Sequence, residues 1–470
     1  MKIFCSLVRA LLLLLAMVTV ATIQASSASP AVQQVPAMRI TFSEPLAIFV
    51  FSKSLTERGW YGSKPFTKLF RESKFATKPY LDAIAALESL RLGYYFEYPD
   101  YPGKNANSTG YLLHRDLVRS SSLEEFRSRA LGTIPNEDLA KLLSILNELT
   151  PVYRELVYTP NKDRFEQQLS ELRQLLTSTD AAKLLQQGLT FYDSVWDPRD
   201  EFILAFFPVP GSGGYTATTV ANMGMSPLPT GMTDYGGLLS VMFHEVFHIF
   251  YDEQSRAVKR NLTSWFAQNP SRHSEYAQGL LNEALATALG NGYVASKLKG
   301  SLNEGAWYND KHISLMAKLI YPTVLSYLES DRRIDQVFVD KYVELYDSHT
   351  ADFLTVDGVL SGRDVLFDRA SDVARIDTAF PHRVDGNDLP LDEKTLKSSL
   401  KKGITRLILV TGDHEAKLKL IRENVPELGD WQPDAKTDFA YAILLPDRRY
   451  LIVVNAVTKG VDELLKTVKL

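Results

Sequence analysis

The chain has 470 residues, a formal net charge of -4 and a single cysteine, Cys5. With so small a net charge and no block of Lys or Arg, the composition gives no indication of a nucleic-acid partner or an anionic membrane surface. Because Cys5 stands at the extreme N-terminus, the rest of the chain has no intrachain disulfide, thiolate ligand or thiol nucleophile. The length leaves room for a large core and for two domains.

The N-terminal residues are typical of a secretory signal peptide, predicted over 1–28. Lys2 and Arg9 precede an apolar run from Ala10 to about Val20, and small residues follow up to Ala28. The run is shorter than the roughly 20 residues of a membrane span, which disfavours the alternative of an uncleaved anchor. We therefore expect an exported protein, periplasmic or extracellular, with no span in the mature chain. The short basic start and the lack of disulfides favour a bacterial envelope.

A linker is predicted over 29–37 and a main domain over 38–383. In its first part, 38–200, apolar residues recur at three- and four-residue spacing, which predicts amphipathic helices over Tyr80–Leu92, Asn136–Leu149 and Asp163–Leu176. A second part, 201–350, begins with β-rich segments at Phe202–Phe207 and Tyr215–Met223. Glycines at 211–214 can supply a turn between them, so we expect a β-hairpin.

A long buried helix is predicted to begin near Asp234, because the residues that follow are apolar almost all round. Further helices are expected over Glu275–Tyr293, Asn309–Ser330 and Asp335–Tyr346. The Gly, Asn, Asp and Pro residues over 384–398 indicate a second linker. The last part, 399–470, alternates strand and helix patterns and predicts a small α/β module. The expected fold class is thus α+β, predominantly helical.

The predicted buried helix carries His244-Glu-Val-Phe-His248. Two His residues four apart lie on one helical face and can bind one metal, and zinc is the ion that such a pair favours. A catalytic zinc site needs one more protein ligand and an open position. Glu245 can then take a proton from the attacking water and deliver it to the leaving amine. The alternative is a pair of core histidines bonded to backbone carbonyls.

The third ligand is expected on the next helix. Glu253 follows His248 on the same helix and cannot fold back, and no third histidine follows at the spacing that some zinc peptidases use. Glu283 shares a stripe with the small residues Gly279, Ala286 and Gly290, which let two helices approach closely. Ordinary tight packing with Glu283 at an exposed edge is the alternative reading. His273 and Glu275 remain weaker candidates for the ligand.

These two motifs together resemble the gluzincins, the thermolysin-like class of zinc metallopeptidases. Gly279-Leu-Leu-Asn-Glu283-Ala-Leu-Ala286 following the His-Glu-x-x-His motif matches their paired signature, over less than a third of the chain. The resemblance implies that His244, His248 and Glu283 bind zinc and that Glu245 is the general base. It also implies that Tyr215–Met223 is an edge strand that pairs with an extended peptide, a purely structural hairpin being the alternative.

The chain departs from that class in two ways. Glu283 follows His248 by 283 − 248 = 35 residues, a longer gap than in thermolysin, so that 255–274 is expected to loop out. Thr287 stands where the class has an Asp that bonds the outer nitrogen of a zinc-binding histidine. A later Tyr or His donates to the oxyanion in this class; Tyr321 and His312 are candidates, and Tyr321, before Pro322, is preferred. A core tyrosine is the alternative reading of Tyr321.

The predicted function is zinc-dependent hydrolysis of a peptide bond in a protein, a short peptide or a cell-wall peptide. Intact Glu245 argues for turnover. Two alternative functions remain. The first is an exported zinc-binding scaffold that has lost turnover, which Thr287 favours. The second is a structural protein in which the motif is coincidental. Substrate specificity, oligomeric state and the role of the C-terminal module are not indicated by the sequence.

Overall fold

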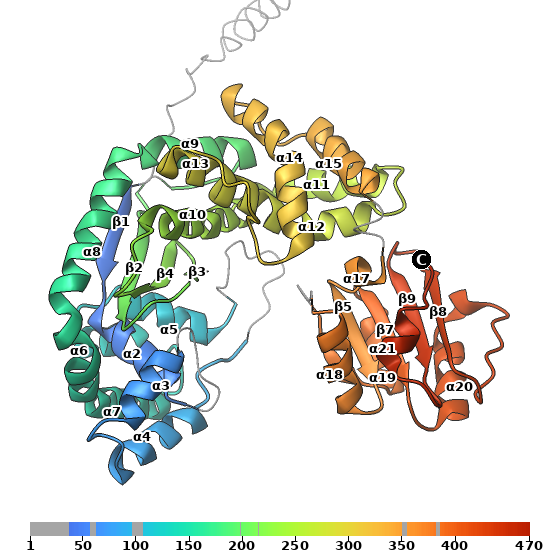
Figure 1. Cartoon of the computed structure of the whole chain (residues 1–470), viewed down its shortest axis with the longest axis horizontal. Helices are drawn as coiled ribbons and strands as arrows, with labels where there is room; N and C mark the ends of the chain where they lie inside the picture. The colour runs from blue at the N-terminus through green and yellow to red at the C-terminus, as the bar shows by residue number, and fades with distance from the viewer. Residues whose placement is uncertain are drawn as a thin grey trace, which may run out of the picture. The chain divides into compact units, whose positions relative to one another are not determined.

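The structure is a computed structural model that describes residues 37–56, 63–95, 107–197, 199–214, 216–349, 355–381 and 386–470 (Figure 1). The predicted signal peptide over 1–28 and all but the last residue of the linker over 29–37 lie outside these residues. The described fold is α+β and mostly helical, as predicted. No helix in the described part of the chain combines the length and the apolar character that a membrane crossing requires.

A helical layer follows the first strand, and it confirms the three predicted amphipathic helices as α4, α7 and α8. In α7 the leucines at 139, 142, 146 and 149 are buried, which is the three-and-four spacing of one helical face. The elements are α2 (Glu44–Ser54), α3 (Ser63–Arg71), α4 (Lys78–Ser89), α5 (Thr109–Val118), α6 (Leu123–Ala130), α7 (Asn136–Tyr153), the π-helical η1 (Arg154–Tyr158), α8 (Thr159–Ser178) and α9 (Ala181–Tyr192).

The first sheet joins residues from both ends of this helical layer. Its strands are β1 (Met38–Phe42), β2 (Phe202–Val209), β3 (Thr218–Val220) and β4 (Met223–Pro229), in the order β1-β2-β4-β3 among the described residues. β2 pairs in parallel with both β1 and β4, and β3 pairs antiparallel with β4. The predicted hairpin between 202–207 and 215–223 is therefore wrong, since the tight turn is at Ala221, whose φ of 50° is left-handed, between β3 and β4.

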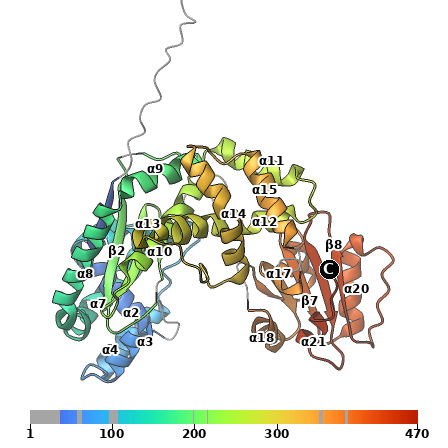
Figure 2. The same ribbon diagram turned by 45° about the horizontal axis from the view of Figure 1, so that its top comes forward.

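The helix that carries the histidines, α10 (Tyr235–Asp252), lies between this sheet and the later helices (Figures 1 and 2). Its predicted cap is confirmed, because the Asp234 side chain accepts from the Gly237 amide. The following elements are α11 (Arg256–Gln268), α12 (Ser274–Ala286), the π-helical η2 (Thr287–Val294), α13 (Ala295–Lys299), α14 (Lys311–Glu329) and α15 (Gln336–Ser348). The expected loop over 255–274 is wrong: most of it is α11, whose Val258, Leu262 and Phe266 are buried.

A second sheet orders its strands β6-β5-β7-β9-β8 within the described residues, all parallel except β8. Its elements are α17 (Val356–Val359), β5 (Arg363–Phe367), α18 (Ala370–Ala379), β6 (Asp388–Pro390), α19 (Glu393–Ser399), β7 (Thr405–Val410), α20 (His414–Asn424), the 3₁₀ turn η3 (Pro426–Leu428), β8 (Phe439–Leu444), β9 (Tyr450–Asn455) and α21 (Val461–Leu465). The expected strands after 399 are present as β7, β8 and β9.

The C-terminal sheet begins earlier than the sequence indicated. The described part of the predicted linker over 384–398 contains β6 and most of α19, and β5 lies inside the predicted main domain of 38–383. β6 is short and ends in Pro390, so it has the composition of a loop, and it becomes a strand only by pairing with β5. β5 begins with the charged residues Arg363 and Asp364, so its hydrophobicity pattern does not predict a buried strand, although both residues are fully buried.

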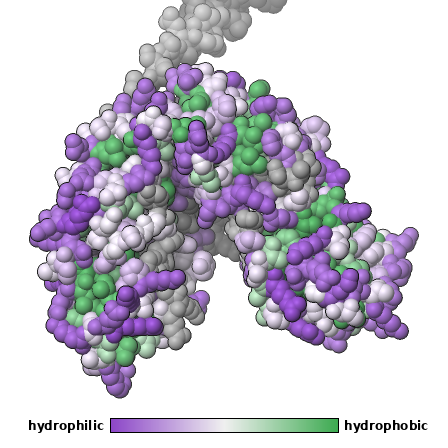
Figure 3. Space-filling view, in the orientation of Figure 1, coloured by the Kyte–Doolittle hydropathy of each residue, from purple (hydrophilic) through white to green (hydrophobic). Residues whose placement is uncertain are grey.

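Hydrogen bonds join the start of α12 to the C-terminal sheet. The Tyr276 hydroxyl accepts from the Tyr450 amide at 2.8 Å and bonds the Thr405 hydroxyl at 2.8 Å. Arg448 donates to the Ser274 hydroxyl at 2.6 Å. Within Pro36–Leu470 the described residues form one compact unit. The face seen in Figure 3 is mainly hydrophilic, with scattered hydrophobic patches.

Candidate metal centre

The two histidines of α10 lie on its buried face and point at each other. Their Nε2 atoms are 3.0 Å apart, and their side chains are 6% and 3% exposed for His244 and His248. Burial lowers the pKa of His244, although Glu283 and Glu245 oppose that shift. A neutral imidazole is the form that binds a metal, so burial prepares His244 as a ligand.

Glu283 reaches both histidines from α12, as the sequence predicted. One carboxylate oxygen lies 3.5 Å from His244 Nε2 and the other 3.3 Å from His248 Nε2. Burial disfavours the charged carboxylate, but the two imidazoles beside it outweigh burial and hold the pKa of Glu283 below its usual range. Glu283 is therefore ionised at neutral pH and offers a negative ligand to the space between the rings.

The close approach of the helices depends on Gly290, in η2. A β-carbon at this position would stand 2.6 Å from the backbone nitrogen of His244, closer than atoms can pack. Gly290 thus plays the part predicted for the small residues of the stripe. Gly279, on the same predicted stripe, instead faces Arg449 of the C-terminal sheet.

Glu245 lies beside the histidine pair and is held from the sheet. Thr219, in the edge strand β3, donates to its carboxylate at 3.1 Å. The potential ligand atoms of His244, Glu245 and His248 lie within 4.8 Å of one another. Two carboxylates are thus close enough to bind an ion here. Glu283 contacts both rings, whereas the Glu245 carboxylate accepts from Thr219.

The outer nitrogens of the two rings have different surroundings. His248 Nδ1 lies 2.9 Å from the side-chain oxygen of Asn282, and since that oxygen can only accept, we assign the proton to Nδ1 and leave Nε2 as a lone pair. His244 Nδ1 is buried without a hydrogen-bond partner among the described residues, and so is the Thr287 hydroxyl. Among the described residues His244 thus has no partner for its outer nitrogen, whereas Asn282, which the sequence analysis missed, supports His248.

Tyr308 is a further residue that the sequence analysis missed. Its ring stacks on His244 with centroids 5.7 Å apart. Burial, followed by the negative charges of Glu283 and Glu245, raises the pKa of Tyr308, so its hydroxyl keeps its proton at neutral pH. Tyr308 precedes α14 in a loop, outside the predicted helix of Asn309–Ser330, and its only sequence signal is the aromatic pair Trp307-Tyr308.

The other residues considered from sequence are elsewhere. Tyr321 packs against Trp307, with ring centroids 5.1 Å apart. In the described part of the chain its interactions are with residues other than His244, Glu245, His248 and Glu283. His312 is buried at the start of α14, 3.8 Å from Asp357. His273 lies 3.7 Å from Asp347. Glu275 stands in the first turn of α12, about two turns before Glu283.

The distances between the side-chain atoms of His244, His248 and Glu283 fit tetrahedral coordination of one metal ion. Two nitrogen ligands ~2.0–2.1 Å from a zinc at the tetrahedral angle are roughly 3.3 Å apart, and the three separations here are 3.0, 3.3 and 3.5 Å. The lone pair of His248 also faces a carboxylate oxygen, so two acceptors meet unless a cation or a proton lies between them. The chemistry of this donor set therefore suits a divalent metal.

No family model, curated protein or solved structure matches this chain.

Proposed function

We propose that this chain is an exported, gluzincin-like zinc peptidase that hydrolyses peptide bonds in a peptide or protein. One observation carries the proposal: two buried imidazoles and one carboxylate converge at ligand spacing, with a second carboxylate, Glu245, beside them. The zinc, held by His244, His248 and Glu283, would supply Lewis-acid activation of water and of the scissile carbonyl.

The residues around the pair have distinct tasks in this proposal. Glu245 accepts the proton of the attacking water and later transfers it to the leaving amine. The Thr219 hydroxyl orients the Glu245 carboxylate for both steps. Tyr308, protonated at neutral pH, donates to the oxygen that becomes negative in the transition state. It takes the role expected of Tyr321.

The substrate would bind as an added strand. β3 is the edge strand of the first sheet, and its Thr219 contacts the proposed base. A peptide that paired with the outer edge of β3, whose Thr219 and Val220 are buried in this structure, would therefore pass close to Glu245. Strand addition binds through the backbone and demands little of the sequence, in keeping with a peptidase for several peptides.

The test measures zinc content and peptidase activity of the purified chain and of three variants. We expect Glu245→Gln to keep one zinc and lose turnover by about 10³-fold or more, since the general base is removed. Glu283→Ala should lose the zinc, because two imidazoles alone leave it under-coordinated. The control is Glu253→Ala, at the C-terminal end of α10, which should keep both properties. Stoichiometric zinc in Glu283→Ala would contradict the ligand assignment.

A second candidate function is a zinc-binding scaffold without turnover. The buried His244 Nδ1 without a partner among the described residues favours it, because that position usually carries a carboxylate or carbonyl acceptor. One zinc per chain with no cleavage of a broad peptide library would identify this case. A chain without zinc would instead leave the motif as a structural coincidence.

A further inference from the structure

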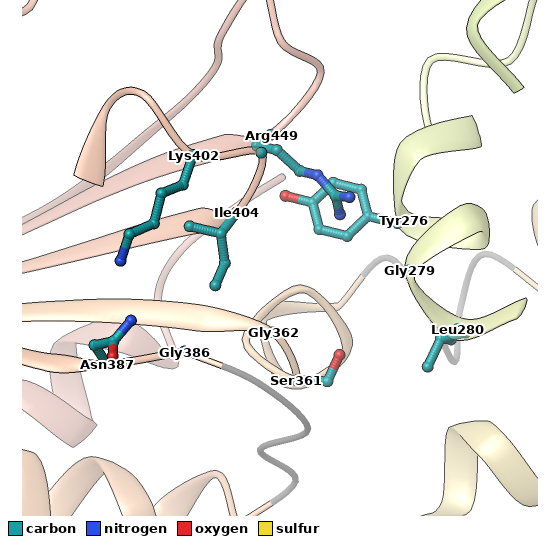
Figure 4. Close-up of a pocket in the computed structure, with 11 residues that line it drawn as sticks. Tyr276, Gly279, Leu280, Ser361, Gly362, Gly386, Asn387, Lys402, Ile404 and Arg449 are labelled. Carbon is teal, nitrogen blue, oxygen red and sulfur yellow. The ribbon is translucent and has the colours of Figure 1, made fainter. Parts of the chain in front are cut away.

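A pocket of about 370 Å³ lies between α12 and the C-terminal sheet (Figure 4). Its lining contains two cations, Lys402 and Arg449, and no carboxylate. Nothing lies within 4 Å of where a β-carbon would stand on the lining residues Gly362 and Gly403, so the space beside their backbone is open. The pocket is therefore positively charged and has room for a ligand.

Arg449 is the cation that this pocket presents. Its guanidinium lies over the ring of Tyr276, 4.7 Å from the centroid, with its terminal nitrogens toward Gly279 (Figure 4). Its Nε is buried without an acceptor, and the guanidinium makes no ion pair among the described residues. Lys402, in contrast, is paired with Asp364 at 2.8 Å.

The neighbouring residues fix the turn that presents Arg449. Asp447 pairs with buried Arg406 at 2.6 Å. Arg448, with a left-handed φ of 57°, donates to the carbonyls of Asn269 and Ser271. Because both preceding residues are engaged, the side chain of Arg449 is positioned before any ligand arrives, which reduces the entropy lost on binding.

The pocket and the candidate metal centre share helix α12. Gly279 and Glu283 are four residues apart on α12, which is ~6 Å along the axis and ~40° around it. An extended peptide advances ~3.3 Å per residue. The pocket and Glu283 thus share a short length of α12, and a peptide whose C-terminus enters the pocket would run along this length of the helix.

We propose that Arg449 and this pocket form a subsite for a carboxylate of the peptide substrate, chiefly its C-terminal carboxylate. The proposal rests on the proposed function, since it places the anion beside the bond to be cleaved. The guanidinium presents parallel N–H donors that match the two oxygens of a carboxylate. The enzyme would then prefer peptides with a free C-terminus and release short C-terminal fragments.

The test uses the full chain with zinc, carrying Glu245→Gln so that bound peptide is not cleaved. The probes are a labelled neutral hexapeptide with a free C-terminal acid, the same peptide as its amide, and the amide with an internal Glu. We expect the acid to bind about tenfold more tightly than the amide, the effect of a charged hydrogen bond. Adding Arg449→Gln should abolish this difference, and Arg422→Gln, an exposed arginine on α20, should preserve it.

Gly279→Leu gives a second variant from the opposite wall, because its β-carbon fits 3.8 Å from Arg449 and the rest of the side chain would fill the pocket. It should abolish the acid preference as well. Tight binding of the internal-Glu amide would extend the subsite to side-chain carboxylates. Equal binding of acid and amide, or a difference that survives Arg449→Gln, would overturn the proposal. Since binding needs no turnover, failure of the wild type to cleave peptides would reject only the proposed peptidase.

Discussion

Buried charge is handled in two different ways in this molecule. In the C-terminal sheet, fully buried Asp364 accepts from Lys402, Ser399 and Asn387, so its charge is compensated within the fold. Around α10, the imidazole nitrogens and the Glu283 carboxylate face one another with no cation of the chain among them in the described residues. The first arrangement is complete by itself. The second is completed only by a bound cation or a proton, which is why we propose only the second as a functional centre.

We expect the largest effect, a loss of folding stability, from a change in the Asp364 cluster of the C-terminal sheet. Asp364→Ala removes the acceptor of several buried donors and should lower the free energy of unfolding by about 3–5 kcal/mol. Chemical denaturation would measure it. The control is Glu463→Ala, in an exposed pair with Lys459, which should change stability by less than about 1 kcal/mol. The destabilisation caused by Asp364→Ala should be the same with and without a metal chelator. A destabilisation that disappears with the chelator would contradict the view that the Asp364 cluster is independent of the proposed metal site.

The same variant has a defined pH dependence. Hydrogen bonds, chiefly from Lys402, outweigh burial and lower the pKa of Asp364 in the folded protein. A depressed carboxyl pKa contributes stability that is present above the unfolded value of ~3.9 and lost as the pH falls through the folded value. The difference between wild type and Asp364→Ala should therefore be full at neutral pH and shrink in acid.

On the uncompensated side, Tyr308→Phe should lower kcat about 10²-fold, by about 3 kcal/mol, because a donor to the developing oxyanion is lost. Zinc content should stay the same, since the hydroxyl is not among the assigned ligands. Tyr321→Phe is the matched comparison and should retain activity, because that ring packs against Trp307. Steady-state kinetics on one peptide would separate the two. A larger loss in Tyr321→Phe would return the role to the residue preferred from sequence.

The smallest of these effects concerns the support of His248. Asn282→Ala removes the acceptor of its Nδ1 proton and should weaken zinc affinity about 10- to 100-fold. Competition with a chromogenic chelator would measure the affinity. Gln278→Ala, one turn earlier on α12, is the control and should leave it unchanged. Equal affinities in the two variants would show that the histidine needs no such support.

Local features of the sequence determined the elements that carry the site. His244, Glu245 and His248 share a helix whose periodicity and cap are both local, so α10 and its Asp234 cap could be predicted. The position of Glu283 beside the histidines was also predictable, because Glu283 is the ionisable residue on a stripe of small residues. Helical periodicity repeats within a few residues and needs no knowledge of distant parts of the chain.

Tertiary structure alone decided the rest. Tyr308 stands in a loop without periodicity, and Arg449 reaches α12 from a turn between two late strands, so neither position can be predicted from neighbouring residues. β6 becomes a strand only by pairing with β5. Strand pairing, helix approach and the meeting of charges join residues far apart in sequence, and their energies depend on burial that exists only in the folded chain.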